Sequence, residues 1–204
     1  MHFNKNDKIG SYTVAFPHKQ GSYAETYRVK DQNGKTQFLK LINYSKLNRN
    51  QFDDDGRVIE IEIAKRLKHH NLCQLIESGS MMMNGGQFAW FVTEFVSGET
   101  LSQRIIRDDN ISVYDIKVIA KAVLSALSFL HSQPTPIIHN EVTIQNVLLN
   151  LTAGFQDLKL IDFGNACFLD QHPVKLHLNE FNPFYLAPER FSGVSSVQAD
   201  LYSV

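Results

Sequence analysis

The stretch His139-Asn140-Glu141-Val142-Thr143-Ile144-Gln145-Asn146 decides how this chain is interpreted, and Asp162-Phe163-Gly164 begins sixteen residues after it ends. The Asp-Phe-Gly triplet alone says little, because three common residues meet by chance in a chain of 204 residues. The order of the other motifs around the triplet is more informative. Ala187-Pro188-Glu189 lies downstream of it. Lys40 and Glu60 lie upstream, on a predicted strand and a predicted helix. The whole set has a negligible probability of arising by accident.

The first half of the chain has the period-two pattern of β-strands, interrupted by turn-rich segments. A charged run of three aspartates precedes apolar residues at helical spacing, which predicts one helix between the third and fourth strands. The predicted elements are strands near 12–16, 23–29, 37–42, 72–76 and 88–95, and a helix containing Ile59, Ile63 and Leu67.

The second half has a helical pattern. Ser112 and Asp115 form a predicted capping box, and the residues that follow trace one apolar helix face. That face consists of Ile116, Ile119, Ala120, Val123, Leu124, Leu127 and Leu130. Two short apolar runs at 147–149 and 158–161 come next. A strand-rich half joined near residues 96–98 to a helical half predicts two lobes with a ligand site between them.

Composition narrows the class of protein. Hydrophobic residues make up 43% of the chain and the formal net charge is −1, so an ordinary globular fold is expected, with no electrostatic preference for nucleic acid or an anionic membrane. No apolar run is long enough for a membrane span or a signal peptide. The two cysteines, Cys73 and Cys167, predict neither a disulfide framework nor a zinc ribbon, and a cytoplasmic location is expected.

On these motifs the sequence resembles the eukaryotic-type protein kinase family, whose signatures include a glycine-rich loop, a strand lysine, a helix glutamate, a catalytic loop, D-F-G and A-P-E. The resemblance implies an α+β, bilobal fold. Residues 1–96 would form an N-lobe with a five-stranded antiparallel sheet and one helix. Residues 97–204 would form a partial C-lobe with the catalytic loop, the activation segment and the start of the central helix.

The resemblance also implies roles for individual residues. Lys40 would grip the ATP phosphates and Glu60 would orient it, because a fixed ammonium needs a second charge. Asn146 and Asp162 would be the Mg²⁺ ligands, since hard cations prefer oxygen donors. Glu141 would be the catalytic base that accepts the proton of the substrate hydroxyl.

Other residues would contact the nucleotide. Gly21 belongs to the predicted glycine-rich loop, and Thr93, Glu94 and Val96 match the linker between lobes, whose backbone would bind adenine. Glu99 is placed to reach a ribose hydroxyl, and an ordinary surface glutamate is the alternative. Only the middle of three family glycines is present, and Phe38 stands where the family has a small alanine. Phe38 would narrow the adenine site unless it turns into the space left by Thr26.

The catalytic loop departs from the family pattern. Asn140, Glu141 and Thr143 stand where the family usually has Arg, Asp and Lys, and Asn182 replaces a threonine. The extra methylene of Glu141 displaces the carboxylate by roughly an ångström, and such misplacement costs on the order of 10²-fold in rate. A slow or inactive enzyme is therefore expected.

Regulation is also expected to differ. The family arginine at position 140 pairs with a phosphate on the activation segment, and an amide would do so weakly. No Ser or Thr lies between Gly164 and Ala187, where Tyr185 is the only hydroxyl. We therefore predict that phosphorylation of this segment does not switch the protein.

The sequence leaves the function open between classes. The leading hypothesis is an ATP- and Mg²⁺-dependent protein kinase acting on Ser or Thr of a protein substrate, although Thr143 weakens the Ser/Thr assignment. The alternatives are a pseudokinase that binds nucleotide or acts as a scaffold, and, more remotely, transfer of another group or to a small molecule. The sequence stops just after Asp200-Leu201-Tyr202, so a partner or second copy is expected to cover the lobe if the chain is not a fragment.

Overall fold

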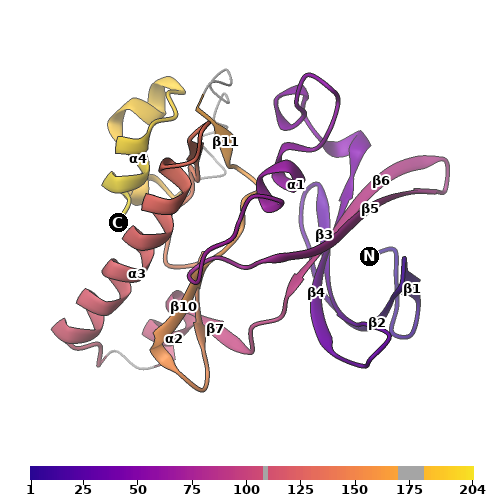
Figure 1. The fold of residues 1–204 in the computed structure, drawn as a ribbon, viewed down its shortest axis with the longest axis horizontal. Coiled ribbons are helices and arrows are strands. Elements are labelled where there is room, and N and C mark those ends of the chain that lie inside the picture. The colour runs from indigo at the N-terminus through magenta and orange to yellow at the C-terminus, as the bar shows by residue number, and fades with distance from the viewer. Residues whose placement is uncertain (108–109, 170–181) are drawn as a thin grey trace. The chain divides into compact units, whose positions relative to one another are not determined.

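The computed structural model of this protein describes residues 1–107, 110–169 and 182–204 (Figure 1). Its contacts separate the chain into two units. One contains Met1–Ile61 and Gln74–Phe95, and the other contains Glu62–Cys73 and Val96–Val204. The fold is α+β, as predicted from the sequence, because the first unit is built on an antiparallel sheet and the second carries the longest helix.

The sheet of the first unit has six strands in the order β1-β2-β3-β4-β6-β5 (Figure 1). The strands are β1 (Lys8–Ile9), β2 (Tyr12–Gln20), β3 (Ala24–Lys30), β4 (Thr36–Asn43), β5 (Leu75–Met83) and β6 (Gly86–Glu94). The five predicted strands correspond to β2 to β6. The sixth, β1, pairs with β2 at the edge, and two residues are too few to show an alternating pattern.

Each face of this sheet packs against its own apolar cluster. One cluster includes Leu39 and Leu41 of β4 together with Trp90 of β6. The other includes Ile42 of β4 and Ile61, which lies in helix α1 (Ile59–Ala64). Since side chains alternate along a strand, Lys40 is on the same face as Ile42. The register of β4 therefore directs Lys40 toward the side that carries α1.

Two element boundaries predicted from the sequence are wrong. The strand expected at 72–76 begins at Leu75 and continues to Met83, because Asn84 and Gly85 alone form the turn into β6. Their φ angles of 51° and 75° are those of a type I′ hairpin turn, which favours Asn-Gly. The helix predicted to reach Leu67 ends at Ala64.

The second unit contains the predicted long helix, α3, whose capping box joins Ser112 and Asp115 as expected. Its helices are α2 (Leu101–Arg107), α3 (Val113–His131) and α4 (Val197–Tyr202), with short 3₁₀ turns η4 (Pro183–Tyr185) and η5 (Pro188–Ser192). Two further 3₁₀ turns, η1 (Tyr44–Lys46) and η2 (Arg49–Gln51), belong to the first unit. The apolar face of α3 is only partly buried, since Leu127 and Leu130 are inaccessible whereas Ile116 is 55% exposed.

Two small sheets complete the second unit. One has the order β10-β9-β7 and the other pairs β11 with β8. Their strands are β7 (Gly98–Thr100), β8 (Ile137–Ile138), β9 (Val147–Asn150), β10 (Gly154–Leu160) and β11 (Cys167–Phe168). The segment Glu62–Cys73 joins this unit because the Lys159 ammonium donates to the carbonyls of His70, at 2.7 Å, and Leu72, at 3.3 Å.

Gly98 is required where β7 meets β9. A Cβ at this position would lie 2.0 Å from the backbone oxygen of Leu149, which cannot yield without breaking the strand pairing. We expect Gly98→Ala to lower the free energy of unfolding by about 3 kcal/mol or more, measured by urea denaturation. Gly34→Ala is the control, because Gly34 has a positive φ but open surroundings and should cost only about 1 kcal/mol. Equal losses in the two variants would contradict this assignment.

Candidate active site

In the first unit Lys40 and Glu60 form an ion pair. The Lys40 ammonium donates to Oε1 of Glu60 at 2.6 Å, and the two side chains are 12% and 7% exposed. Tyr23 completes the cluster, since its hydroxyl donates to Oε2 of Glu60 at 3.4 Å and accepts from the ammonium at 3.3 Å. The Lys40 ammonium also lies 5.2 Å from the centre of the Tyr23 ring. The structure thus brings together the two residues paired from the sequence and adds Tyr23.

Tyr23 belongs to the predicted glycine-rich loop, which is a tight turn between β2 and β3. The Gly21 amide donates to the carbonyl of Ala24 at 2.8 Å, and a Cβ on Gly21 would lie 3.3 Å from that oxygen. The Asn43 amide donates to the carbonyl of Tyr23 at 3.0 Å, which attaches the turn to the end of β4. These bonds hold the aromatic ring over Lys40.

Phe38 and Thr93 are cross-strand partners on the face that carries Lys40. The Phe38 ring packs edge-on against His18, with ring centres 5.8 Å apart. The Thr26 hydroxyl donates to the backbone of β2. Phe38 is therefore held by an aromatic neighbour on β2, a contact that the sequence did not indicate.

The other residues predicted to bind nucleotide lie around the end of β6. Glu94 exchanges backbone and side-chain hydrogen bonds with Gln74, at 3.2 and 3.1 Å. Val96 begins the second unit. Glu99, on β7, binds the Arg107 guanidinium of α2 through both carboxylate oxygens, and this hydrogen bonding lowers the pKa of Glu99. The hydrogen bonds with Arg107 thus account for the orientation of the Glu99 side chain without a ligand.

In the second unit the β9–β10 hairpin brings Asn146 and Asp162 to the same end. Val147 is paired with Leu160, and one step further the Ile161 amide donates to the carbonyl of Asn146 at 2.9 Å. Asp162 comes next and is exposed, with φ of 65°, a left-handed conformation that Asp tolerates better than most residues. Two residues predicted as magnesium ligands are therefore neighbours across the hairpin.

Glu141 lies beside this end of the hairpin. Nδ2 of Asn146 donates to the backbone carbonyl of Glu141 at 3.0 Å, which fixes the orientation of the Asn146 amide. The Glu141 carboxylate accepts through Oε2 from Nδ2 of Asn165 at 2.9 Å. The second unit thus brings Glu141, Asn146 and Asp162 together, and adds Asn165, which the sequence gave no reason to select.

A buried aspartate anchors the catalytic loop. Asp200, on α4, is 1% exposed and accepts the backbone amides of His139 and Asn140, each at 2.8 Å. Nε2 of His131, in the last turn of α3, lies 2.9 Å from the same carboxylate. The sequence predicted the start of a helix in this part of the chain, but not the contact of Asp200 with residues about sixty positions earlier.

His139 is buried in its neutral form. Burial lowers the pKa of His139, and nearby Asp200 only partly opposes this effect. Nδ1 of His139 accepts a hydrogen bond from the backbone amide of Glu141 at 3.3 Å. Nε2 of His139 lies 3.2 Å from the carbonyl oxygen of Ile161. A neutral imidazole that carries its proton on Nε2 satisfies both contacts. His139 therefore holds the backbone on both sides of the site.

This depressed pKa predicts a pH dependence of stability. Because the folded-state pKa of His139 lies below the unfolded value near 6.5, the unfolded chain binds the extra proton first as the pH falls. The free energy of unfolding should therefore decrease below about pH 6.5, by up to about 1.4 kcal/mol per pH unit from this group. In His139→Phe, which cannot titrate, urea denaturation between pH 7.5 and 5.5 should give a shallower slope. An unchanged slope would refute the assignment.

The remaining substituted positions have structural partners. The carbonyl of Thr143 accepts the Asn146 amide at 2.9 Å. The Asn182 side chain accepts the amide of Phe184 at 3.1 Å and caps η4. Most of the predicted activation segment, residues 170–181, lies outside the described residues, so the prediction about its phosphorylation stays a prediction.

The donor set near Asp162 fits Mg²⁺ bound together with a substrate. An amide and a carboxylate suit this ion, which usually takes one or two protein carboxylates, waters and phosphate oxygens. Within residues 1–107, 110–169 and 182–204, no group of three or more His, Cys, Asp or Glu could hold a metal. Cys73 and Cys167 are both free thiols. No helix in the described parts of the chain is long and apolar enough to cross a membrane.

Comparison with known proteins agrees with these features. The family model of the protein kinase domain matches residues 19–204. The serine/threonine-protein kinase TIO of Arabidopsis thaliana is 34% identical over 174 residues, which are 83% of this chain and 12% of that protein. The calcium-dependent protein kinase 5 of Plasmodium berghei is 26% identical over 186 residues, 90% of this chain and 31% of that protein.

A titin homolog of Caenorhabditis elegans is 30% identical over 192 residues, 93% of this chain and 1% of that protein. The chain therefore spans less than a third of the length of each of these relatives. The family match, in contrast, covers most of the chain and includes the lysine–glutamate pair, the catalytic loop and the D-F-G motif. This chain belongs to the protein kinase domain family.

Proposed function

We propose that the protein transfers the γ-phosphoryl group of Mg²⁺-bound ATP to a Ser or Thr hydroxyl of a protein substrate. The observation that carries this proposal is the convergence of Glu141, Asn146 and Asp162 at one end of the β9–β10 hairpin. Membership of the protein kinase family supports it. Residues 1–96 and 97–204 would act as the two lobes, and a cytoplasmic location fits this activity.

The chain's own residues would bind and orient the triphosphate. Lys40, held by Glu60, would contact phosphate oxygens, and the oxygens of Asn146 and Asp162 would hold the metal. When bound, Mg²⁺ would neutralise charge on the transferring phosphoryl group. The adenosine would lie against the backbone of Thr93, Glu94 and Val96, with Gly21 near the phosphates and Glu99 near the ribose.

Glu141 would accept the proton of the attacking hydroxyl. A carboxylate retains the general-base chemistry of the family aspartate, and its longer side chain changes only the reach. The Ser/Thr preference rests on the resemblance, and the family lysine that supports it is replaced by Thr143.

One observation favours the pseudokinase alternative. Tyr23 places its ring and hydroxyl against Lys40 and Glu60, where phosphates would bind. Transfer then requires Tyr23 to leave this position, whereas a module that signals through its shape does not. The exposed apolar residues of α3, Ile116 at 55% and Tyr114 at 69%, would suit a partner or a second copy in either case.

The test is transfer of ³²P from γ-labelled ATP to a mixture of generic proteins, with Mg²⁺ and then with EDTA. We expect slow, Mg²⁺-dependent labelling that phosphoamino-acid analysis assigns to Ser and Thr. Asp162→Asn should abolish the labelling, because it removes the charged metal ligand. Binding of ATP without any transfer would favour the pseudokinase, and labelling that survives in Asp162→Asn would overturn the assigned site.

A further inference from the structure

Two of the three substituted positions in the predicted catalytic loop, Asn140 and Glu141, bind the same residue. Nδ2 of Asn140 donates to the backbone carbonyl of Asn165 at 2.9 Å. Nδ2 of Asn165 in turn donates to Oε2 of Glu141 at 2.9 Å. Adjacent residues of one loop thus hold the backbone and the side chain of a residue that follows the D-F-G motif.

The strand register explains why these residues meet. In the β8–β11 pair, Ile138 is opposite Cys167 and Ile137 is opposite Phe168. Continued past the ends of both strands, this antiparallel register places residue 140 opposite residue 165. The Ala166 amide also donates to the carbonyl of Phe163 at 3.1 Å, so a turn fixes the backbone at Asn165.

The anchor of this arrangement is buried. Asn140 is 6% exposed, and its backbone amide donates a hydrogen bond to the buried Asp200 carboxylate at 2.8 Å. Its side chain also donates to Sγ of Cys167 at 3.3 Å. The side-chain amide of Asn140 therefore forms hydrogen bonds inside the fold. The family arginine at this position would instead bind a phosphate on the activation segment. The chain of contacts runs from Asp200 through Asn140 and Asn165 to the Glu141 carboxylate.

We propose that Asn165 is a positioning residue that holds the Glu141 carboxylate for catalysis, with Asn140 holding Asn165. This inference rests on the proposed function. A glutamate has one more rotatable bond than the family aspartate, so it loses more conformational freedom when it is held in one orientation. A neutral amide can fix that orientation through a charge-assisted hydrogen bond without placing a full positive charge beside the base.

The first experiment measures the pair through thermal unfolding, without reference to activity. Asn165→Asp places two carboxylates in hydrogen-bond contact and should lower Tm by about 2–4 °C at neutral pH. Adding Glu141→Gln should restore Tm to within about 1 °C of wild type, because the amide and the carboxylate have then exchanged places. A double variant that is no more stable than Asn165→Asp overturns the pairing.

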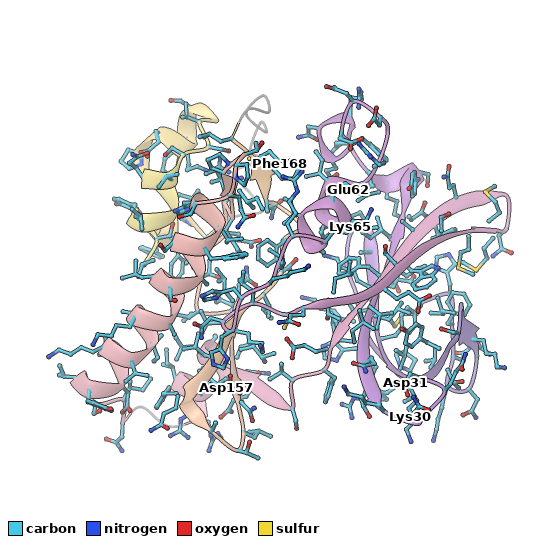
Figure 2. The ribbon with its side chains drawn as sticks, viewed as in Figure 1. Lys30, Asp31, Glu62, Lys65, Asp157 and Phe168 are labelled. Carbon is cyan, nitrogen blue, oxygen red and sulfur yellow. The ribbon has the colours of Figure 1, made fainter. Side chains whose placement is uncertain are left out.

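A matched control exists on the β9–β10 hairpin. Asn150 on β9 donates its amide to Oδ2 of Asp157 on β10 at 2.8 Å, and Asp157 is labelled in Figure 2. Asn150→Asp should lower Tm in the same way, but Glu141→Gln should not recover that loss. Recovery in both backgrounds would mean that Glu141→Gln stabilises the fold generally, and would overturn the specific contact.

The second experiment measures catalysis. Asn165→Ala should lower kcat by about 10- to 100-fold, while KM for ATP stays within about twofold, because only the placement of Glu141 changes. Asn165→Gln, which keeps the amide donor, should recover part of kcat, and Asn150→Ala should have the wild-type kcat. A wild-type kcat in Asn165→Ala overturns the positioning role even if the Tm coupling is present.

The outcomes separate this inference from the proposed function. Tm coupling with no phosphoryl transfer by the wild type removes the proposed function and, with it, the catalytic role of Asn165, and leaves a structural contact. Transfer without Tm coupling keeps the function and overturns the pair. Full transfer by the Glu141→Gln/Asn165→Asp variant would show that Glu141 is not the base, and would overturn the positioning role.

Discussion

Glu141→Gln is expected to lower the rate of phosphoryl transfer from Mg²⁺-bound ATP by about 10²- to 10⁴-fold, the contribution typical of a general base. The amide keeps the size of the side chain and can still accept the hydrogen bond from Asn165, so the fold should persist. ATP affinity should change by less than about twofold, because Glu141 would act on the hydroxyl and not on the nucleotide. Single-turnover transfer and calorimetric ATP titration measure the two quantities.

Glu141→Asp gives the informative comparison. It restores the family residue but shortens the side chain, so the carboxylate moves away from Asn165. If Asn165 and Glu141 act as a unit, Glu141→Asp should be slower than wild type. Transfer by Glu141→Gln at the wild-type rate would contradict the role of Glu141.

Lys40→Met is expected to destabilise the first unit and impair transfer together. It leaves the Glu60 carboxylate, 7% exposed, without its ammonium partner, although the Tyr23 hydroxyl remains as a donor. Loss of one partner of a buried pair costs about 3–5 kcal/mol, and the remaining donor should limit the loss to about 2–4 kcal/mol. Loss of a preorganised charge at the phosphates should lower transfer by about 10²- to 10³-fold. Urea denaturation and the transfer assay measure the two effects.

Lys65→Met is the matched control. Lys65 forms a 2.6 Å ion pair with Glu62 (Figure 2), but its side chain is 48% exposed. Exposed pairs of this kind contribute about 0.2–1 kcal/mol, so the loss of stability should stay below about 1 kcal/mol and transfer should be unchanged. If Lys40→Met and Lys65→Met lowered the free energy of unfolding and the transfer rate equally, the greater contribution assigned to the Lys40–Glu60 pair would be refuted.

The sequence predicted the elements whose signals are local. Period-two alternation indicated β2 to β6, and Ser112 with Asp115 indicated the start of α3, because a capping box depends on residues three apart. The end of α1 was misplaced because Leu67 continues the helical spacing, although the helix itself stops at Ala64. The length of β5 was underestimated, because the strand predicted near 72–76 continues to Met83 through its pairing with β6.

The site was predicted only as far as the family motifs reach. The motif order relates a strand to a helix, and the structure brings Lys40 and Glu60 into contact. Asn165 and Tyr23 carry no such signal, since their contacts with Glu141 and Glu60 depend on strand register and turn geometry. Contacts between residues far apart along the chain become visible only when the backbone is placed.

Calorimetric titration of the full chain with ATP, with and without Mg²⁺, tests whether Lys40 and Asp162 both contribute to binding one nucleotide. We expect wild type to bind ATP more tightly with Mg²⁺, Asp162→Ala to lose that Mg²⁺ dependence, and Lys40→Met to bind more weakly under both conditions. Wild type that binds no ATP, or Asp162→Ala and Lys40→Met that both bind Mg²⁺-ATP as tightly as wild type, would contradict a phosphotransferase built on these residues.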